Sequence, residues 1–172
     1  RVFGHPTLKW LQQEWVSSTY GISDMVLNSP DVLSRKTTQN RLNQQFVLGS
    51  LEDAFMIVLH MEHSTAEEEQ TIDLQQKVDK VIGTFESMGA TNIFQKQNDY
   101  KTTSGIEGIV ASGSFDWPKK NKDTQRKNYE VYHFTENKGF QQLQLVYDRN
   151  DRYAKELITR MLNSIEFKKE KP

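Results

Sequence analysis

Two histidines and a glutamate occur together at His60-Met61-Glu62-His63, and these side-chain types are common zinc ligands. The segment continues an apolar run and is predicted to be a strand, in which successive side chains point to opposite faces. His60 and Glu62 are therefore expected on one face and His63 on the other. One histidine and one glutamate make a poor site without distant ligands, so we interpret the motif as a strand end and predict no metal and no cofactor.

A second histidine that could do chemistry is His133, which lies beside Tyr132 in a predicted strand. It could act as an acid–base group in a cleft, but an interior histidine satisfied by hydrogen bonds is the favoured interpretation. The chain has no G-x-S-x-G nucleophile motif and no dinucleotide-binding glycine pattern. We therefore predict that the protein is not an enzyme; a hydrolase that uses His133 or His60 remains an alternative.

The acidic segment Asp148-Arg149-Asn150-Asp151 resembles part of a calcium loop. An EF-hand loop that began at Asp148 would need glycine at its sixth position and glutamate at its twelfth. These positions hold Tyr153 and Thr159. Capping of the following helix is the favoured role.

Five basic residues and one acidic residue lie between Pro118 and Lys127. This segment could bind an acidic partner or lipid headgroups, whereas a solvated hairpin tip would have the same composition. It is the best local candidate for a contact surface, through Lys119, Lys120, Lys122, Arg126 and Lys127.

Polar residues that alternate with apolar ones along two later segments suggest another surface. Gln142 and Gln144 on one predicted strand, with Glu130 and Tyr132 on its neighbour, could form a polar and aromatic binding face. Ordinary cross-strand pairs would look the same.

The composition limits the class of protein. With 172 residues, residues 1–172 are predicted to form one domain, to which residues 1–14 are loosely attached. The 22 basic and 23 acidic residues nearly balance, which disfavours a nucleic-acid partner. There is no cysteine, and the longest apolar run, Ala54 to Leu59, is too short to be a transmembrane segment.

The middle of the chain predicts a hairpin and a helix. Residues 44–50 and 54–63 are rich in strand formers and flank a short loop that contains Gly49. Apolar residues from Leu74 to Met88 then recur every three or four positions, as in an amphipathic helix. Residues 65–68 resemble a capping box for its start, with an acidic run suited to the helix dipole, and Gly89 is a plausible stop.

The second half predicts a meander of strands and a closing helix. Residues 91–97, 105–117, 128–134 and 140–148 are predicted strands. Residues 105–117 and 140–148 alternate with period two, and Gly139 belongs to a tight turn between the last two segments. Residues 153–165 have one apolar helical face, and 164–167 are predicted to return as a short strand. The predicted class is α+β: an antiparallel β-sheet covered by α-helices, in the order β-hairpin, helix, β-meander, helix, terminal short strand.

The first thirty residues are less clear. Leu8, Leu11 and Trp15 fit a helical stripe, whereas the segment from Tyr20 to Leu27 is predicted to be extended before a turn that contains Pro30.

Three passages resemble the PsbP-like group, which includes the extrinsic PsbP subunit of photosystem II, a eukaryotic Ran-binding import factor and many bacterial secreted proteins and lipoproteins. They are "YGISDMVLNSP", "NYEVYHFTENKGFQQLQLVYD" and "DRYAKELITRMLNSIEF". The resemblance covers residues 15–167 and consists of core patterns, so it concerns the fold more than function.

The resemblance implies a non-catalytic module that binds another macromolecule, with a protein partner expected. Because the chain begins at Arg1, a cleaved signal peptide or lipoprotein leader is one explanation and truncation is another. We expect a location outside the cytoplasm, in a bacterial envelope; a cytoplasmic location is the alternative. A carrier of a small apolar ligand, in a cleft between sheet and helix lined by Trp117, Phe134 and Tyr147, is a rival hypothesis.

Overall fold

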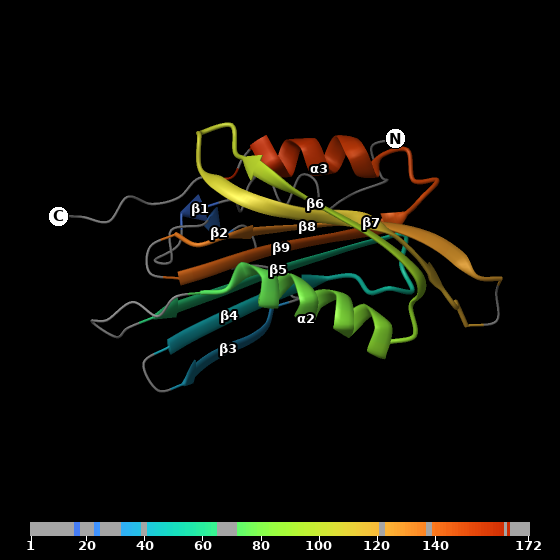
Figure 1. Ribbon diagram of the computed structural model, residues 1–172, viewed down its shortest axis with the longest axis horizontal. Coiled ribbons are helices and arrows are strands. Elements are labelled where there is room, and N and C mark those ends of the chain that lie inside the picture. Colours follow the sequence, from blue (N-terminus) through green and yellow to red (C-terminus); the bar gives the residue numbers. More distant parts are fainter. Residues whose placement is uncertain are drawn as a thin grey trace.

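A seven-stranded antiparallel sheet carries one helix on each face (Figure 1). The computed structural model describes residues 16–17, 23–24, 32–38, 41–64, 72–120, 123–136, 139–163 and 165. The strand order is β3-β4-β5-β9-β8-β7-β6, and every neighbouring pair is antiparallel. The α+β class and the antiparallel sheet are thus confirmed.

The described part of the chain contains strands that pair as hairpins and two helices. The first are the short pair β1 (Val16–Ser17) and β2 (Ser23–Asp24), β3 (Val32–Thr38), β4 (Arg41–Leu48), β5 (Phe55–Ser64) and α2 (Leu74–Ser87). The others are β6 (Thr91–Lys101), β7 (Glu107–Trp117), β8 (Gln125–Phe134), β9 (Gly139–Asp148) and α3 (Ala154–Asn163).

The predicted hairpin, amphipathic helix and meander are observed, as β4–β5, α2 and β6–β9. Strand β3 was not predicted, because its sequence, VLSRKTT, has few apolar residues. The β1 and β2 strands pair only with each other. The helical stripe at Leu8 to Trp15 and the turn at Pro30 lie outside the described residues.

The predicted start of α2 is wrong. The helix begins at Leu74, and the Asp73 carboxylate accepts hydrogen bonds from the backbone N–H groups of Gln75 and Gln76. Its first turn contains no acidic residue, and residues 65–71, which hold the predicted capping box and acidic run, lie outside the described residues. The predicted stop at Gly89 is confirmed, since the helix ends at Ser87, Met88 is its C-cap, and Gly89 follows with a φ of 111°.

Asp151 Oδ1 accepts a hydrogen bond from the backbone N–H of Tyr153 at 2.9 Å, immediately before the closing helix begins at Ala154. No strand follows at Ile165, which is buried and not in a strand; the rest of the predicted terminal strand lies outside the described residues.

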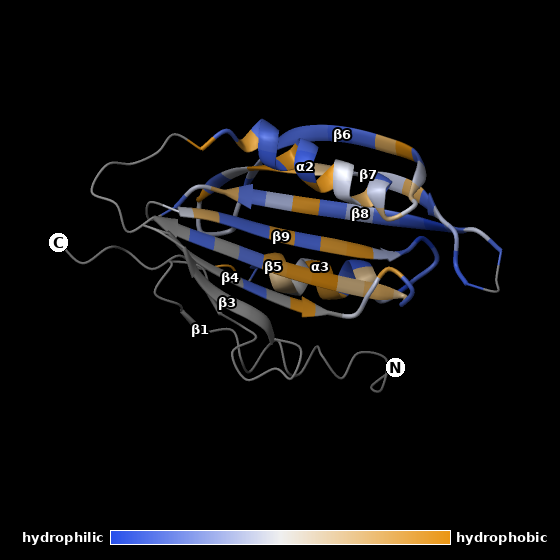
Figure 2. Ribbon diagram, turned by 90° about the horizontal axis from the view of Figure 1, so that it is seen from below, coloured by the Kyte–Doolittle hydropathy of each residue, from blue (hydrophilic) through white to orange (hydrophobic). Residues whose placement is uncertain are grey.

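The two faces of the sheet form separate cores. One face packs against α3 through Ile57, Leu59, Leu143, Leu145 and the helix residues Leu157, Ile158 and Met161. The other packs against α2 through a second set: Met56, Val58, Val81, Phe85, Phe115, Tyr129 and Val146. Strand β5 is apolar on both sides because a helix covers each of its faces, and Figure 2 shows its hydrophobic centre and, at the far edge of the sheet, the largely hydrophilic strand β6.

Candidate functional site

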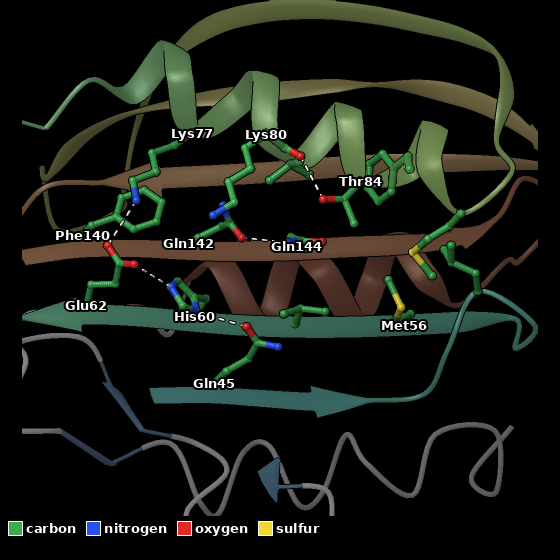
Figure 3. Close-up of a pocket in the computed structure, with 15 residues that line it drawn as sticks. Gln45, Met56, His60, Glu62, Lys77, Lys80, Thr84, Phe140, Gln142 and Gln144 are labelled. Atoms are coloured by element: carbon green, nitrogen blue, oxygen red, sulfur yellow. Dashed lines mark hydrogen bonds and ion pairs between the residues drawn. The ribbon is translucent and has the colours of Figure 1, made fainter. Parts of the chain in front are cut away.

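A cavity of about 330 Å³ opens between α2 and the sheet. We call it the α2 groove. Its floor comes from β4, β5 and β9, and its wall from the helix side chains that face the sheet (Figure 3). One end is polar and the other is apolar. The six residues of the apolar end are Leu51, Met56, Val58, Val81, Phe85 and Met88.

A polar row crosses four strands beneath α2. Gln45 on β4 pairs with His60 on β5, His60 pairs with Gln142 on β9, and Gln142 pairs with His133 on β8. Directly paired residues point to the same face of a sheet. All four side chains therefore point toward α2, although the chain positions are up to 97 residues apart, between 45 and 142.

Hydrogen bonds connect neighbours within this row. His60 Nδ1 lies 3.1 Å from Gln45 Oε1, and Gln142 Nε2 lies 2.9 Å from His133 Nε2. Gln144 Nε2 donates to Gln142 Oε1 at 2.7 Å, which orients the Gln142 amide so that its nitrogen faces His133. His133 Nε2 then accepts, and the ring proton resides on Nδ1.

Glu62 links the sheet to the helix. Its carboxylate lies 3.3 Å from His60 Nε2 and 3.2 Å from the Lys77 ammonium of α2 (Figure 3). The hydrogen bond from His60, followed by the charge and hydrogen bond of Lys77, lowers the pKa of Glu62 to about 2. The Lys77 ammonium also lies 4.7 Å from the centroid of the Phe140 ring, a cation–π contact. We call these contacts the Glu62 latch.

His133 is completely buried and stacks on Phe140, with ring centroids 5.5 Å apart. Its Nδ1 has no hydrogen-bond partner within the described part of the chain. Burial, and then the nearby charge of Lys77, lower the pKa of His133 to about 4, so the ring is neutral at pH 7. The interpretation of His133 as an interior histidine is correct, but only one of its two nitrogens is satisfied.

Within the described residues, the structure brings no further metal-ligating histidine or carboxylate side chain to His60 and Glu62. His60 and Glu62 do share a face, as predicted, but the groove around them supplies Gln45 and Lys77. No group of three or more histidine, aspartate or glutamate side chains within the described residues could hold a metal ion.

The basic segment 118–127 does not form one exposed surface. Lys127 is fully buried, and its ammonium donates to Asp148 Oδ1 at 2.8 Å and to the Asp53 carbonyl at 2.7 Å. Lys119 forms an ion pair with the same Asp148 carboxylate at 3.5 Å. The carboxylate of Asp148, which was predicted to cap the following helix, thus neutralises the buried Lys127 ammonium.

Arg126 is also held within the molecule. It donates to Asp116 Oδ1 at 3.0 Å and to Ser114 Oγ at 2.6 Å. Lys120 is exposed, and Lys122 lies outside the described residues. Lys127 is therefore too deeply buried to belong to an exposed contact surface, and Arg126 is partly exposed and paired with Asp116.

The predicted polar face of Tyr132, Gln142 and Gln144 is also wrong. Tyr132 pairs with Leu143, and Gln142 pairs with His133, so Tyr132 and the two glutamines lie on opposite faces of the sheet. Tyr132 is buried on the α3 side. Gln142 is only 7% exposed and lies in the floor of the α2 groove with Gln144.

Tyr132 belongs instead to a tyrosine cluster around Glu130. The hydroxyl groups of Tyr132 and Tyr147 donate to the two carboxylate oxygens of Glu130. Burial, followed by the Glu130 charge, raises the pKa of Tyr147 to about 12 and that of Tyr132 still further. Both phenols therefore stay protonated and act as hydrogen-bond donors.

The predicted cleft of Trp117, Phe134 and Tyr147 is not formed. Trp117 belongs to the core under α2, whereas Phe134 and Tyr147 belong to the core under α3. A cleft between sheet and helix does exist, but other residues line it.

Sequence reasoning missed the helix side of the groove. Lys77, Lys80 and Thr84 occur with helical spacing next to the apolar stripe of α2, and all three line the groove. That spacing could have predicted that the three side chains lie on the same side of the helix. The pairing of Gln45 with His60 could not be predicted from the sequence, because it depends on the register between strands.

The chain matches no known protein family, no curated protein and no solved structure. No helix in the described ranges has the length and apolar character needed to cross a membrane.

Proposed function

We propose that this protein is a non-catalytic binding module that holds a small amphipathic ligand in the α2 groove. The observation that carries the proposal is the division of one cavity into a polar row and an apolar end. Small-molecule sites are typically concave, largely apolar and equipped with a few placed polar groups, with volumes of roughly 300–1,000 Å³. The groove, at about 330 Å³, has this character and fits a ligand of modest size.

Binding suits the groove better than catalysis. The hydroxyl of Thr84, which lines it, donates to the Lys80 carbonyl at 2.9 Å and is not directed at a histidine. His133 cannot reach a ligand as an acid–base group, because it is fully buried and its Nε2 accepts from Gln142. A hydrolase would need a nucleophile beside a base, and no such pair occurs among the described lining residues.

The experiment fills the groove. Thr84→Trp places a large ring among the lining residues, whereas Glu86→Trp places the same ring at an exposed position of α2 that does not line the groove. Binding of a C8 amphiphile, measured by isothermal titration calorimetry, should be lost with Thr84→Trp and kept with Glu86→Trp. Equal binding by both variants would contradict the proposal, and circular dichroism would establish that both are folded.

A second candidate is a module that assembles with a protein partner, and the edge strand β6 favours it. Phe94 on β6 is 59% exposed, and an exposed edge strand can pair with another chain. Affinity capture with wild type and Phe94→Asp would test it. A protein retained by wild type and released by the variant supports this function, whereas identical capture by both rejects it.

We also propose a PsbP-like arrangement for the sheet and its two helices, and a bacterial envelope location. In support, the second resembling passage forms the β8–β9 hairpin and the third contains α3. A crystal structure that superposes poorly on PsbP-like proteins would reject the arrangement. Fractionation of cells that express the full-length gene tests the location, and recovery in the cytosol would reject it.

A further inference from the structure

Resting on the proposed function, we propose that the ligand of the α2 groove is an aliphatic carboxylate. Its carboxylate head lies at Lys80 and the glutamines of the polar row, and its chain extends over Met56 toward Met88. Figure 3 shows this polarity: Lys80 and Gln142 lie toward the polar end, and Met56 lies toward the other.

The charged side chains described in the lining of the groove carry a net positive charge. Glu62 is the acidic residue among the described lining residues, and it is already in contact with Lys77 and His60. Lys80 also lines the groove, one helical turn after Lys77, and its ammonium forms no ion pair or hydrogen bond within the described part of the chain. An anionic group placed beside Lys80 would neutralise this charge.

The free hydrogen-bonding groups are mostly donors. The side-chain amide of Gln45 already hydrogen-bonds His60, and the donor in that bond depends on the tautomer of the His60 ring. Gln142 and Gln144 each use one amide N–H within the row, to His133 and to Gln142, and keep the second. The Lys80 ammonium adds its own N–H bonds, whereas within this pair of glutamines only Gln144 has an oxygen that accepts no hydrogen bond from a described residue. A head group that accepts hydrogen bonds and carries negative charge, as a carboxylate does, fits this balance.

The apolar end suits an unbranched chain. Val81 and Phe85 of α2 are buried and form one wall, and Met56 and Val58 of β5 form the floor. Met88, at the C-terminal end of α2, is 51% exposed. Methionine side chains are flexible and polarizable, so they can close over a chain that lacks a rigid shape.

The test compares three ligands with the same chain and different heads: octanoate, 1-octanol and octylammonium, titrated into the whole chain at pH 7.4. We expect octanoate to bind best. Lys80→Gln should weaken the binding of octanoate about fivefold, as expected for the loss of a partly exposed ion pair, and should leave the affinity for 1-octanol unchanged. Lys120→Gln is the matched control, because Lys120 is exposed and does not line the groove; it should change neither ligand.

The outcomes separate this inference from the proposed function. Two results would overturn the carboxylate assignment while the groove remained a ligand site. In the first, octanoate and 1-octanol bind with equal affinity and Lys80→Gln changes neither. In the second, octylammonium binds best. Failure of all three ligands to bind would instead overturn the proposed function itself.

Discussion

Gln142 and His133 lie directly opposite each other on β9 and β8, and Gln142 Nε2 is 2.9 Å from His133 Nε2. Through this contact the floor of the α2 groove is continuous with a fully buried histidine. Gln144 orients the Gln142 amide, so the proton on His133 is placed on Nδ1, which has no partner among the described residues. A buried donor without a partner lowers the free energy of unfolding by about 1–3 kcal/mol, and an apolar side chain at the same place would not have this cost.

The first prediction concerns the pH dependence that His133 imposes. Its pKa is about 4 in the folded chain and about 6.5 when unfolded, so the unfolded state binds more protons between these values. The free energy of unfolding should therefore fall as the pH falls from 7 to 5, by about 2 kcal/mol from this residue. Urea unfolding at the two pH values measures it.

His133→Gln is the comparison, because an amide keeps an acceptor for Gln142 and does not titrate. Its stability should change less between pH 7 and 5 than that of wild type. Glu136, whose pKa burial raises, has the opposite effect, but it is present in both proteins and cancels. An identical pH dependence in the two proteins would show that His133 is accessible to protons in the folded state.

The second prediction concerns the Glu62 latch at lower pH. The pKa of Glu62 is about 2 in the folded chain and about 4.5 otherwise, so its stabilisation is present above pH 4.5 and is lost as the pH falls toward 2. Glu62→Gln should lower the free energy of unfolding by about 1–2 kcal/mol at pH 7, and by much less near pH 2.5. Urea unfolding at both pH values measures the change.

The exposed ion pair between Lys101 and Glu107, with 3.9 Å between Nζ and Oε1, is the matched control. Because solvent screens this pair, Glu107→Gln should change the free energy of unfolding by less than about 0.5 kcal/mol. If both substitutions had the same small effect, the latch would not stabilise the position of α2.

The third prediction concerns the buried Lys127 ammonium. Asp148→Asn removes the charge that faces it, and an uncompensated buried charge costs about 3–5 kcal/mol. Lys119→Gln removes a partner of the same Asp148 carboxylate but leaves Lys127 paired, so it should cost about 1 kcal/mol or less. Chemical denaturation measures both. Equal costs would mean that water reaches Lys127.

The fourth prediction compares two glycines. A Cβ at Gly113 of β7 would lie 1.8 Å from the Phe94 carbonyl oxygen of β6, so Gly113→Ala must displace the edge strand. A Cβ at Gly83 of α2 meets nothing within 4 Å, and Gly83→Ala should stabilise the helix by roughly 0.5–1 kcal/mol. Thermal unfolding should show opposite shifts; a stable Gly113→Ala variant would contradict the close approach of β6.

The groove itself could be read from the sequence only in part. The alternation of Leu143, Gln144 and Leu145 correctly placed the glutamines on the opposite face from the leucines. It did not show that a helix of the same chain covers that face and buries Gln142. Period-two alternation distinguishes two faces of a strand, but both can be covered when helices pack on both sides.

The basic segment shows a second limit. Lys127 is one of five basic residues in a polar stretch, and its composition indicates a solvated loop. Its burial depends on Asp148 and the Asp53 carbonyl, which approach from another strand and another loop. A local pattern contains no information about such partners.

The sequence by itself determined the local elements: the periods of α2, α3 and the β6–β9 meander, and the stop of α2 at Gly89, because these depend on neighbours a few residues apart. Only the tertiary structure decided which side chains meet. The row from Gln45 to His133 and the Glu62 latch depend on strand register and on the face that α2 covers. Both are set by packing between segments far apart in the chain, and one residue of slip would turn every side chain of a strand to the other face.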